Sequence, residues 1–149
     1  LYPLVQTLCA ITVSDLQRQD EALVGEAQYH LGNMAVLQGE YGQARHLYGE
    51  SLQIAERLGN QRGRAISLHQ LGTIAKDQGE YEEARRLYKE SLHIKEQLGD
   101  QAGRAGTLHQ LGMIAQEQGE YEKAQRLYEE SLHIEERLGD QAGGKCPTK

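Results

Sequence analysis

Residues 61–100 read QRGRAISLHQLGTIAKDQGEYEEARRLYKESLHIKEQLGD, and residues 101–140 repeat this stretch with identity at 29 of 40 positions. A weaker copy occupies residues 21–60, so the chain repeats with one fixed period. Such a period is typical of a solenoid, in which each unit buries its apolar face against its neighbours. The repetition therefore predicts the architecture more strongly than it predicts a function.

Each copy contains two helical patterns separated by a glycine. The first apolar stripe of residues 61–100 has amphipathic helix spacing, at Ala65, Leu68, Leu71, Gly72 and Ala75. Residues 78–80 interrupt this pattern, and a second stripe fills residues 81–98. Gly79 and Gly99 suit left-handed helix stops, and Asp100 suits the cap of the next helix. No strand pattern is present, so we expect an all-α fold of antiparallel helix pairs.

Small residues where the two stripes meet predict how the helices of a pair pack. Gly72 and Ala84 lack bulk, so the two backbones can approach closely, while Leu68 and Tyr88 fill the space on either side. A glycine inside a helix costs up to about 1 kcal/mol relative to alanine. Its return in all three copies indicates that close packing offsets this cost.

Residues at these positions resemble the tetratricopeptide repeat. The matching set in residues 61–100 is Leu68, Leu71, Gly72, Ala75, Ala84, Tyr88 and Ser91, and it recurs in residues 101–140 and, less fully, in residues 21–60. The resemblance implies a right-handed superhelical solenoid of about three and a half repeats. The units are longer than the usual tetratricopeptide repeat, and in this they are similar to those of kinesin light chains, polarity scaffolds and arrays linked to bacterial signalling ATPases. All of these are protein-binding modules.

The repeat boundaries give the expected domain organisation. Residues 21–60, 61–100 and 101–140 form repeats 1, 2 and 3. We expect residues 1–20 to form the degenerate second helix of a preceding repeat, which acts as an N-terminal cap. Residues 141–149 are expected to form a tail or the start of a truncated repeat. Because the chain begins with Leu1 rather than methionine, we expect a piece of a longer protein.

Composition narrows the classes of function. The net charge of −6 disfavours nucleic acid and anionic membrane surfaces as partners. Cys9 and Cys146 are far apart and lack metal-ligand spacing, so we expect a reducing, cytoplasmic location and no structural metal. No nucleophile, phosphate-loop or metalloprotease motif is present, so we expect neither enzymatic activity nor a cofactor.

The outward positions of the first helices are the candidate binding residues. We expect them to line a concave groove that binds a peptide or protein segment. The groove set is Tyr29, Asn33, His69, Thr73, Lys76, His109, Met113 and Gln116. Tyr29, His69 and His109 occupy equivalent positions and predict a ladder. Alternatively, the two histidines are duplicated polar surface residues, and a metal between them would lack further ligands.

One binding mode of the family that this sequence resembles is a carboxylate clamp made of Lys and Asn side chains, and its positions can be compared with this sequence. Asn33 matches one clamp asparagine, but Tyr29 stands where the first lysine is required. Gln70, Gly106 and Gln110 replace the other clamp residues. Without those cations a terminal carboxylate lacks its charge-assisted bonds, so chaperone-tail binding is disfavoured.

The second helices carry the expected solvent-facing charges. We expect Lys95 to lie on this solvated face, and Glu82 to pair with Arg86 four residues later. No polar cap follows repeat 3, so we expect an exposed apolar face at Leu127, Leu132 and Ile134.

Three functions follow from this sequence. The first is a non-enzymatic peptide-binding module within a larger scaffold or signalling protein. The second is a self-associating array that forms a homo-oligomer through its apolar end. The third is a sensor arm of a larger ATPase or transcription regulator.

Overall fold

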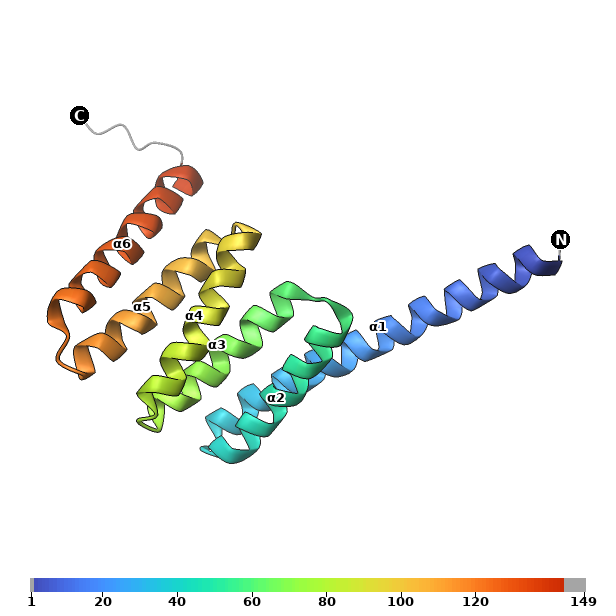
Figure 1. Ribbon diagram of the computed structural model, residues 1–149, viewed down its shortest axis with the longest axis horizontal. Coiled ribbons are helices and arrows are strands. Elements are labelled where there is room, and N and C mark those ends of the chain that lie inside the picture. Colours follow the sequence, from blue (N-terminus) through green and yellow to red (C-terminus); the bar gives the residue numbers. More distant parts are fainter. Residues whose placement is uncertain (1, 144–149) are drawn as a thin grey trace. The chain divides into compact units, whose positions relative to one another are not determined.

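The structure, a computed structural model, describes residues 2–143. This part of the chain contains six helices and no strand (Figure 1). The helices are α1 (Tyr2–Leu37), α2 (Tyr41–Leu58), α3 (Gln61–Asp77), α4 (Tyr81–Leu98), α5 (Gln101–Glu117) and α6 (Tyr121–Gly143). They belong to two compact units, unit 1 (Leu1–Ser67) and unit 2 (Leu68–Lys149). The all-α prediction is confirmed, and each unit is described by itself.

Glycines end the helices where the repeat pattern predicts. Gly79 and Gly99 have φ angles of 77° and 69°, in the left-handed region that favours glycine. After Gly99, Asp100 caps α5, because its carboxylate accepts a hydrogen bond of 2.9 Å from the Gly103 N–H. The predicted stops and the predicted cap are therefore confirmed.

A tyrosine of each second helix packs against a glycine of the preceding first helix. In unit 2, a Cβ atom added to Gly72 would lie 3.0 Å from Cδ1 of Tyr88, and one added to Gly112 would lie 2.7 Å from Cε1 of Tyr128. In unit 1, Tyr48 approaches Gly32 equally closely, at 2.7 Å from such a Cβ atom. The close approach predicted at Gly72 is confirmed.

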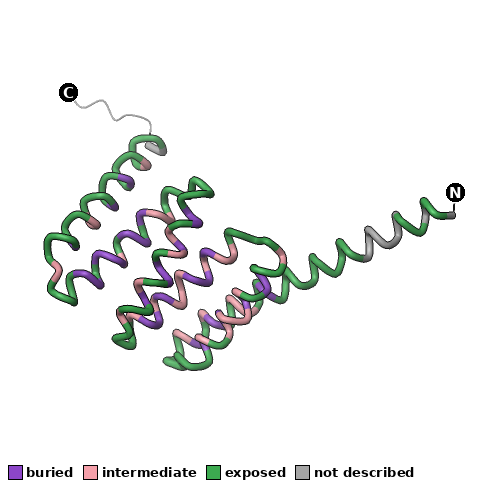
Figure 2. Tube along the Cα trace, viewed as in Figure 1, coloured by how far each residue is buried: buried purple, intermediate pink, exposed green. Residues whose placement is uncertain are grey.

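A buried serine ties the helices of a pair together. Ser51 of α2 donates to the Gly25 carbonyl of α1 at 2.9 Å, and Ser131 of α6 donates to the Ala105 carbonyl of α5 at 2.8 Å. Each hydroxyl thus finds an acceptor across the helix interface, as buried polar groups require. The buried positions follow the facing sides of the helices (Figure 2).

The N-terminal prediction differs from the structure. Residues 1–20 were expected to form a separate helix of a preceding repeat, but α1 is a single helix from Tyr2 to Leu37. Between Pro3 and Gly25 the sequence contains no further proline or glycine, so no local residue ends the helix. The described side chains that precede Gly25 in α1 are exposed, as Figure 2 shows.

The C-terminal helix also runs past its expected end. Leu138-Gly139-Asp140 repeats the sequence that ends α4, yet α6 continues to Gly143. Gly139 therefore does not adopt the left-handed conformation that Gly99 adopts after α4. Most of the tail predicted over 141–149 lies outside the described residues, as does Cys146. The side chain of Cys9 is likewise outside the described set.

Candidate functional site

Unit 1 contains the first two predicted groove residues, and both contact Tyr48. The Tyr29 ring lies 5.8 Å from the Tyr48 ring, measured between centroids. The buried Tyr48 hydroxyl donates to the Asn33 side-chain oxygen at 2.6 Å. Burial, with a smaller contribution from Tyr29, raises the pKa of Tyr48 to about 12, so the phenol remains protonated and donates this bond. Asn33 therefore has a structural role beside its predicted binding role.

Unit 2 places the remaining groove residues on the first helices α3 and α5. Lys76 Nζ of α3 donates to the Gln110 side-chain oxygen of α5 at 2.6 Å, so these two helices are neighbours. His109, Met113 and Gln116 of α5 are exposed. Within this unit, the two first helices that carry these residues therefore lie side by side.

Second-helix tyrosines support these residues as Tyr48 does in unit 1. Tyr88 bonds to the Thr73 hydroxyl at 2.8 Å, and Tyr128 donates to the Gln116 side-chain oxygen at 3.0 Å. The rings of His69 and His109 each lie 5.1 Å from the tyrosine ring of their own repeat. Each predicted ladder residue is therefore packed on a structural aromatic ring instead of extending freely.

A buried lysine brings together groups that the sequence does not connect. Lys95 of α4 is only 7% exposed, so its expected place on the solvated face was wrong. Its Nζ donates to Thr107 Oγ1 of α5 at 2.9 Å and lies 3.3 Å from His69 Nδ1 of α3. Position 55, its equivalent in repeat 1, holds alanine, and this apolar residue is the sequence feature that could have indicated an inward position.

In this cluster, each donor of the buried side chains has an acceptor within hydrogen-bond distance. Thr107 donates its hydroxyl proton to the Gly103 carbonyl at 3.0 Å and so accepts from the Lys95 ammonium. His69 Nδ1 lies 3.1 Å from Thr107 Oγ1 and accepts from Lys95 when the ring is neutral. Burial, with Lys95 and then Lys76 as nearby cations, lowers the pKa of His69 to about 4. Burial also lowers the pKa of Lys95, which Asp100 partly offsets.

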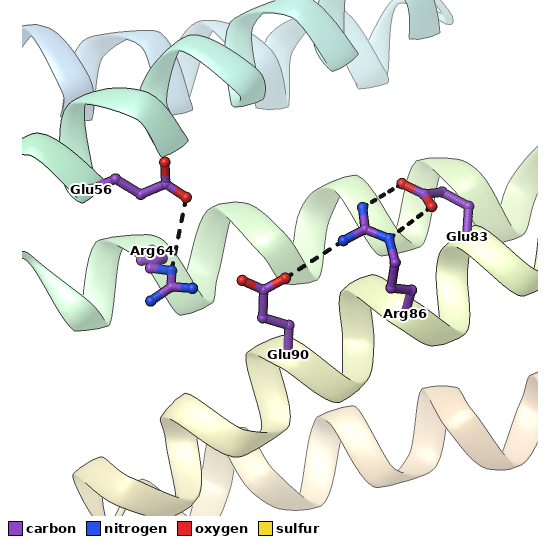
Figure 3. A network of polar contacts seen from close by, with 5 residues as sticks. All are labelled: Glu56, Arg64, Glu83, Arg86 and Glu90. Carbon is purple, nitrogen blue, oxygen red and sulfur yellow. Dashed lines mark hydrogen bonds and ion pairs between the residues drawn. The ribbon is translucent and has the colours of Figure 1, made fainter.

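The outward-facing charges form ion pairs along and between helices (Figure 3). Arg86 contacts Glu83 at 2.7 Å and Glu90 at 3.7 Å, both on α4, so the expected pairing with Glu82 was wrong. In unit 1, Arg64 Nε lies 3.9 Å from Glu56. Solvent-exposed pairs such as those of Arg86 contribute on the order of 0–1 kcal/mol and do not define a site.

The predicted self-association face is only partly exposed. Ile134 is 7% exposed and packs on Ala105 and Leu108 of α5, so its expected exposure was wrong. The reason is that Ile134 lies on the side of α6 that faces α5, where Leu127 packs beside it. Leu132 is 55% exposed and Tyr121 70% exposed, and both line a surface hollow of about 340 Å³ that α6 forms together with Gln116 of α5.

No three His, Cys, Asp or Glu side chains with described positions converge as metal ligands. Within the same part of the chain, no helix has the length and apolar character needed to cross a membrane.

Solved structures of low sequence identity share the fold. BtubC from P. vanneervenii matches with a TM-score of 0.73 and 20% identity over 85% of this chain and 50% of its own. The TPR domain of Arabidopsis FLU matches with a TM-score of 0.72 and 20% identity over 80% of this chain and 98% of its own. A Podosopora anserina putative kinesin light chain with TPR-like repeats matches with a TM-score of 0.66 and 20% identity. The match covers 79% of this chain and 57% of its own. This chain thus spans half the length of BtubC.

Sequence comparison identifies the repeats directly. No curated protein matches the chain. Two sequence models, each described as tetratricopeptide repeat, match residues 23–97 and 104–141. Together with the helix pairs and the tyrosine–glycine contacts, these matches show that the chain belongs to the tetratricopeptide repeat family.

Proposed function

We propose that this chain binds a protein or peptide segment on the surface of its first helices and does so as part of a larger scaffold or signalling protein in the cytoplasm. Tetratricopeptide repeats generally mediate protein–protein interactions and are not enzymes. The membership therefore supports the class of partner, and the residues of unit 2 support the place of binding.

The α3–α5 wall of unit 2 is the observation that carries this proposal. Lys76 and Gln110 link the two first helices, which supports a continuous polar surface. His109, Met113 and Gln116 are exposed beside this link, and Met113 offers an adaptable apolar contact. A surface that combines a flat ring, a thioether and an amide suits a peptide with both apolar and polar side chains.

Affinity capture with a matched pair of variants tests this place of binding. The test variant is His109→Ala with Met113→Ala on α5, and the control is His133→Ala on α6, where another exposed histidine is changed. His69 is left intact because its loss would disturb the buried Lys95 cluster. We expect partners captured by the wild type to be lost from the test variant and retained by the control, at equal helicity in circular dichroism. Retention by both variants would place the binding surface elsewhere.

Self-association through α6 is the second candidate function. The exposed Tyr121 and Leu132 beside the surface hollow favour it, because large exposed apolar side chains mark interaction sites. Sedimentation velocity should then show a concentration-dependent oligomer that Leu132→Glu dissociates. A strict monomer at all concentrations would remove this candidate.

A further inference from the structure

Unit 1 contains a pocket of about 350 Å³, of whose lining only Tyr29 belongs to the predicted groove set. It is bounded by α1, the end of α2 and the start of α3. Ile54, Leu58 and Ile66 form apolar lining, and Ser67 adds a hydroxyl group. Ala55 also lines the pocket and contributes only a methyl group to it.

The equivalent place in unit 2 is filled by a side chain of the protein itself. A shift of one repeat relates Ala55 to Lys95, and Ser67 to Thr107. The Lys95 side chain is buried, and its ammonium reaches the Thr107 hydroxyl at 2.9 Å. Unit 2 therefore shows which side chain suits this position: an unbranched four-carbon stem with a terminal ammonium. In unit 1 the hydroxyl acceptor is kept at Ser67, while Tyr29 stands in the place of His69 and Asn60 in the place of Asp100.

The hydroxyl groups of the unit 1 pocket are oriented to accept hydrogen bonds. Ser67 donates its proton to Ser51 Oγ at 3.3 Å, and Ser51 donates its own to the Gly25 carbonyl at 2.9 Å. Because both hydroxyl protons are already donated, the Ser67 oxygen can only accept a further hydrogen bond, through its lone pairs. Thr107 is in the same state in unit 2, where it donates to Gly103 and accepts from Lys95. A ligand at this position should therefore be a donor, such as an ammonium, and not a carboxylate.

The charged side chains at the pocket do not disfavour an ammonium ligand. Glu26 and Arg62 both line the pocket, and both are exposed to solvent. Their opposite charges offset each other, and His30 lies 3.8 Å from the Glu26 carboxylate. Selection between cationic and anionic ligands then depends on the Ser67 acceptor. The apolar walls suit the methylene stem, since lysine buries its stem along apolar surface.

We infer that the unit 1 pocket binds a lysine side chain of a protein partner, in the place that Lys95 fills in unit 2. The inference rests on the proposed function only in that the lysine belongs to a bound protein segment. The pocket itself is testable without that partner.

Nuclear magnetic resonance titration of the full chain with small ligands tests the pocket. The lysine ligand is Nα-acetyl-lysine N-methylamide, and the matched ligand is the norleucine analogue, which has the same stem without the ammonium. We expect saturable shifts at Gly25, Ile54 and Ile66 with the lysine ligand, and roughly tenfold weaker binding of norleucine, as a charged hydrogen bond implies. Equal binding of both ligands, or stronger binding of a glutamate analogue, would overturn the inference.

Two variants locate the ligand. Ala55→Lys places a lysine side chain where unit 2 has Lys95 and should abolish lysine binding, with helicity in circular dichroism equal to that of the wild type. Ser67→Ala removes the acceptor and should weaken lysine binding roughly tenfold with no change for norleucine; this variant decides the result if Ala55→Lys fails to fold. Undiminished lysine binding by Ser67→Ala would contradict the inference.

The titration and the capture experiment can fail independently of each other, so the pocket and the proposed function are tested separately. Loss of partner capture by the α5 variant concerns the first-helix wall, whereas the ligand titration concerns unit 1 alone. Ligand binding that Ala55→Lys abolishes would support the pocket even where no partner uses the α5 wall. Absence of ligand binding would reject the pocket without affecting the α5 result.

Discussion

Unit 1 and unit 2 share the contact between a tyrosine ring and a helix glycine, but they differ further along the same second helix. Tyr48 and Tyr88 are 1% and 0% exposed, and each closes the gap over the glycine of its own unit. About two helical turns beyond this shared contact, Ala55 borders a pocket, whereas Lys95 fills its equivalent. The comparison teaches that repeated residues determine how helices pair, while divergent residues determine the chemistry between them.

Removing the shared tyrosine should give the largest effect. Tyr48→Ala and Tyr88→Ala should each lower the free energy of unfolding by about 3–5 kcal/mol, because each leaves a cavity against a glycine. Tyr128→Ala should cost less, since Tyr128 is only half-buried. Urea denaturation, with hydrogen exchange resolved to α2 and α4, measures the loss in each unit. Markedly unequal losses for Tyr48 and Tyr88 would break the equivalence of the two contacts.

Acidification should destabilise unit 2 through His69. The folded-state pKa is about 4 against the ordinary 6.5, so between these values the unfolded state binds a proton that the folded state does not. Stability is therefore lost as the pH falls through this window, by up to about 3 kcal/mol. The cations Lys95 and Lys76 face the ring and oppose its protonation.

The unit 1 residue supplies the matched variant for this acid response. His69→Tyr introduces the side chain found at the equivalent position 29, and it should remove that part of the pH dependence. Thermal melts of both proteins between pH 4 and pH 7 measure the difference. An unchanged pH dependence in His69→Tyr would show that the buried cluster does not govern acid stability.

Overpacking the helix seam should give the smallest of the three effects. Gly72→Leu should cost about 1–3 kcal/mol, because its new side chain meets the Tyr88 ring. Gly32→Leu should cost a similar amount in unit 1, where the Tyr48 ring is as close. Gly106→Leu on α5 is the control, since a Cβ atom there meets nothing within 4 Å. Chemical denaturation of all three variants gives the comparison, and equal losses at Gly72 and Gly106 would refute the packing explanation.

Exposure was predicted correctly for three residues of α5, whereas the burial of Lys95 was not predicted. The outward spacing of the first helices identified His109, Met113 and Gln116, which are exposed. It also selected His69, but as a rung of a ladder and not as part of a buried cluster. The difference has a physical cause: exposure follows from one helix, whereas the Lys95 cluster requires acceptors from α3 and α5 at once.

Sequence alone determined the helix pairs and their close seams. The fixed period, the apolar stripes and the glycines are local features, and each acts through one or two turns of helix. Gly79, Gly99 and the Gly72–Tyr88 contact therefore lie where the pattern predicts.

Only the tertiary structure decided whether equivalent positions of the repeats adopt the same local structure and the same burial. Leu-Gly-Asp ends α4 at Leu98, where α5 packs on α4, but the same three residues at 138–140 lie within α6. Lys95 is buried because neighbouring helices offer it neutral acceptors, while Ala55 leaves that space unfilled. Contacts with neighbouring helices supply the free energy that decides where a helix ends and which side chain is buried. The sequence of a single repeat does not contain these contacts.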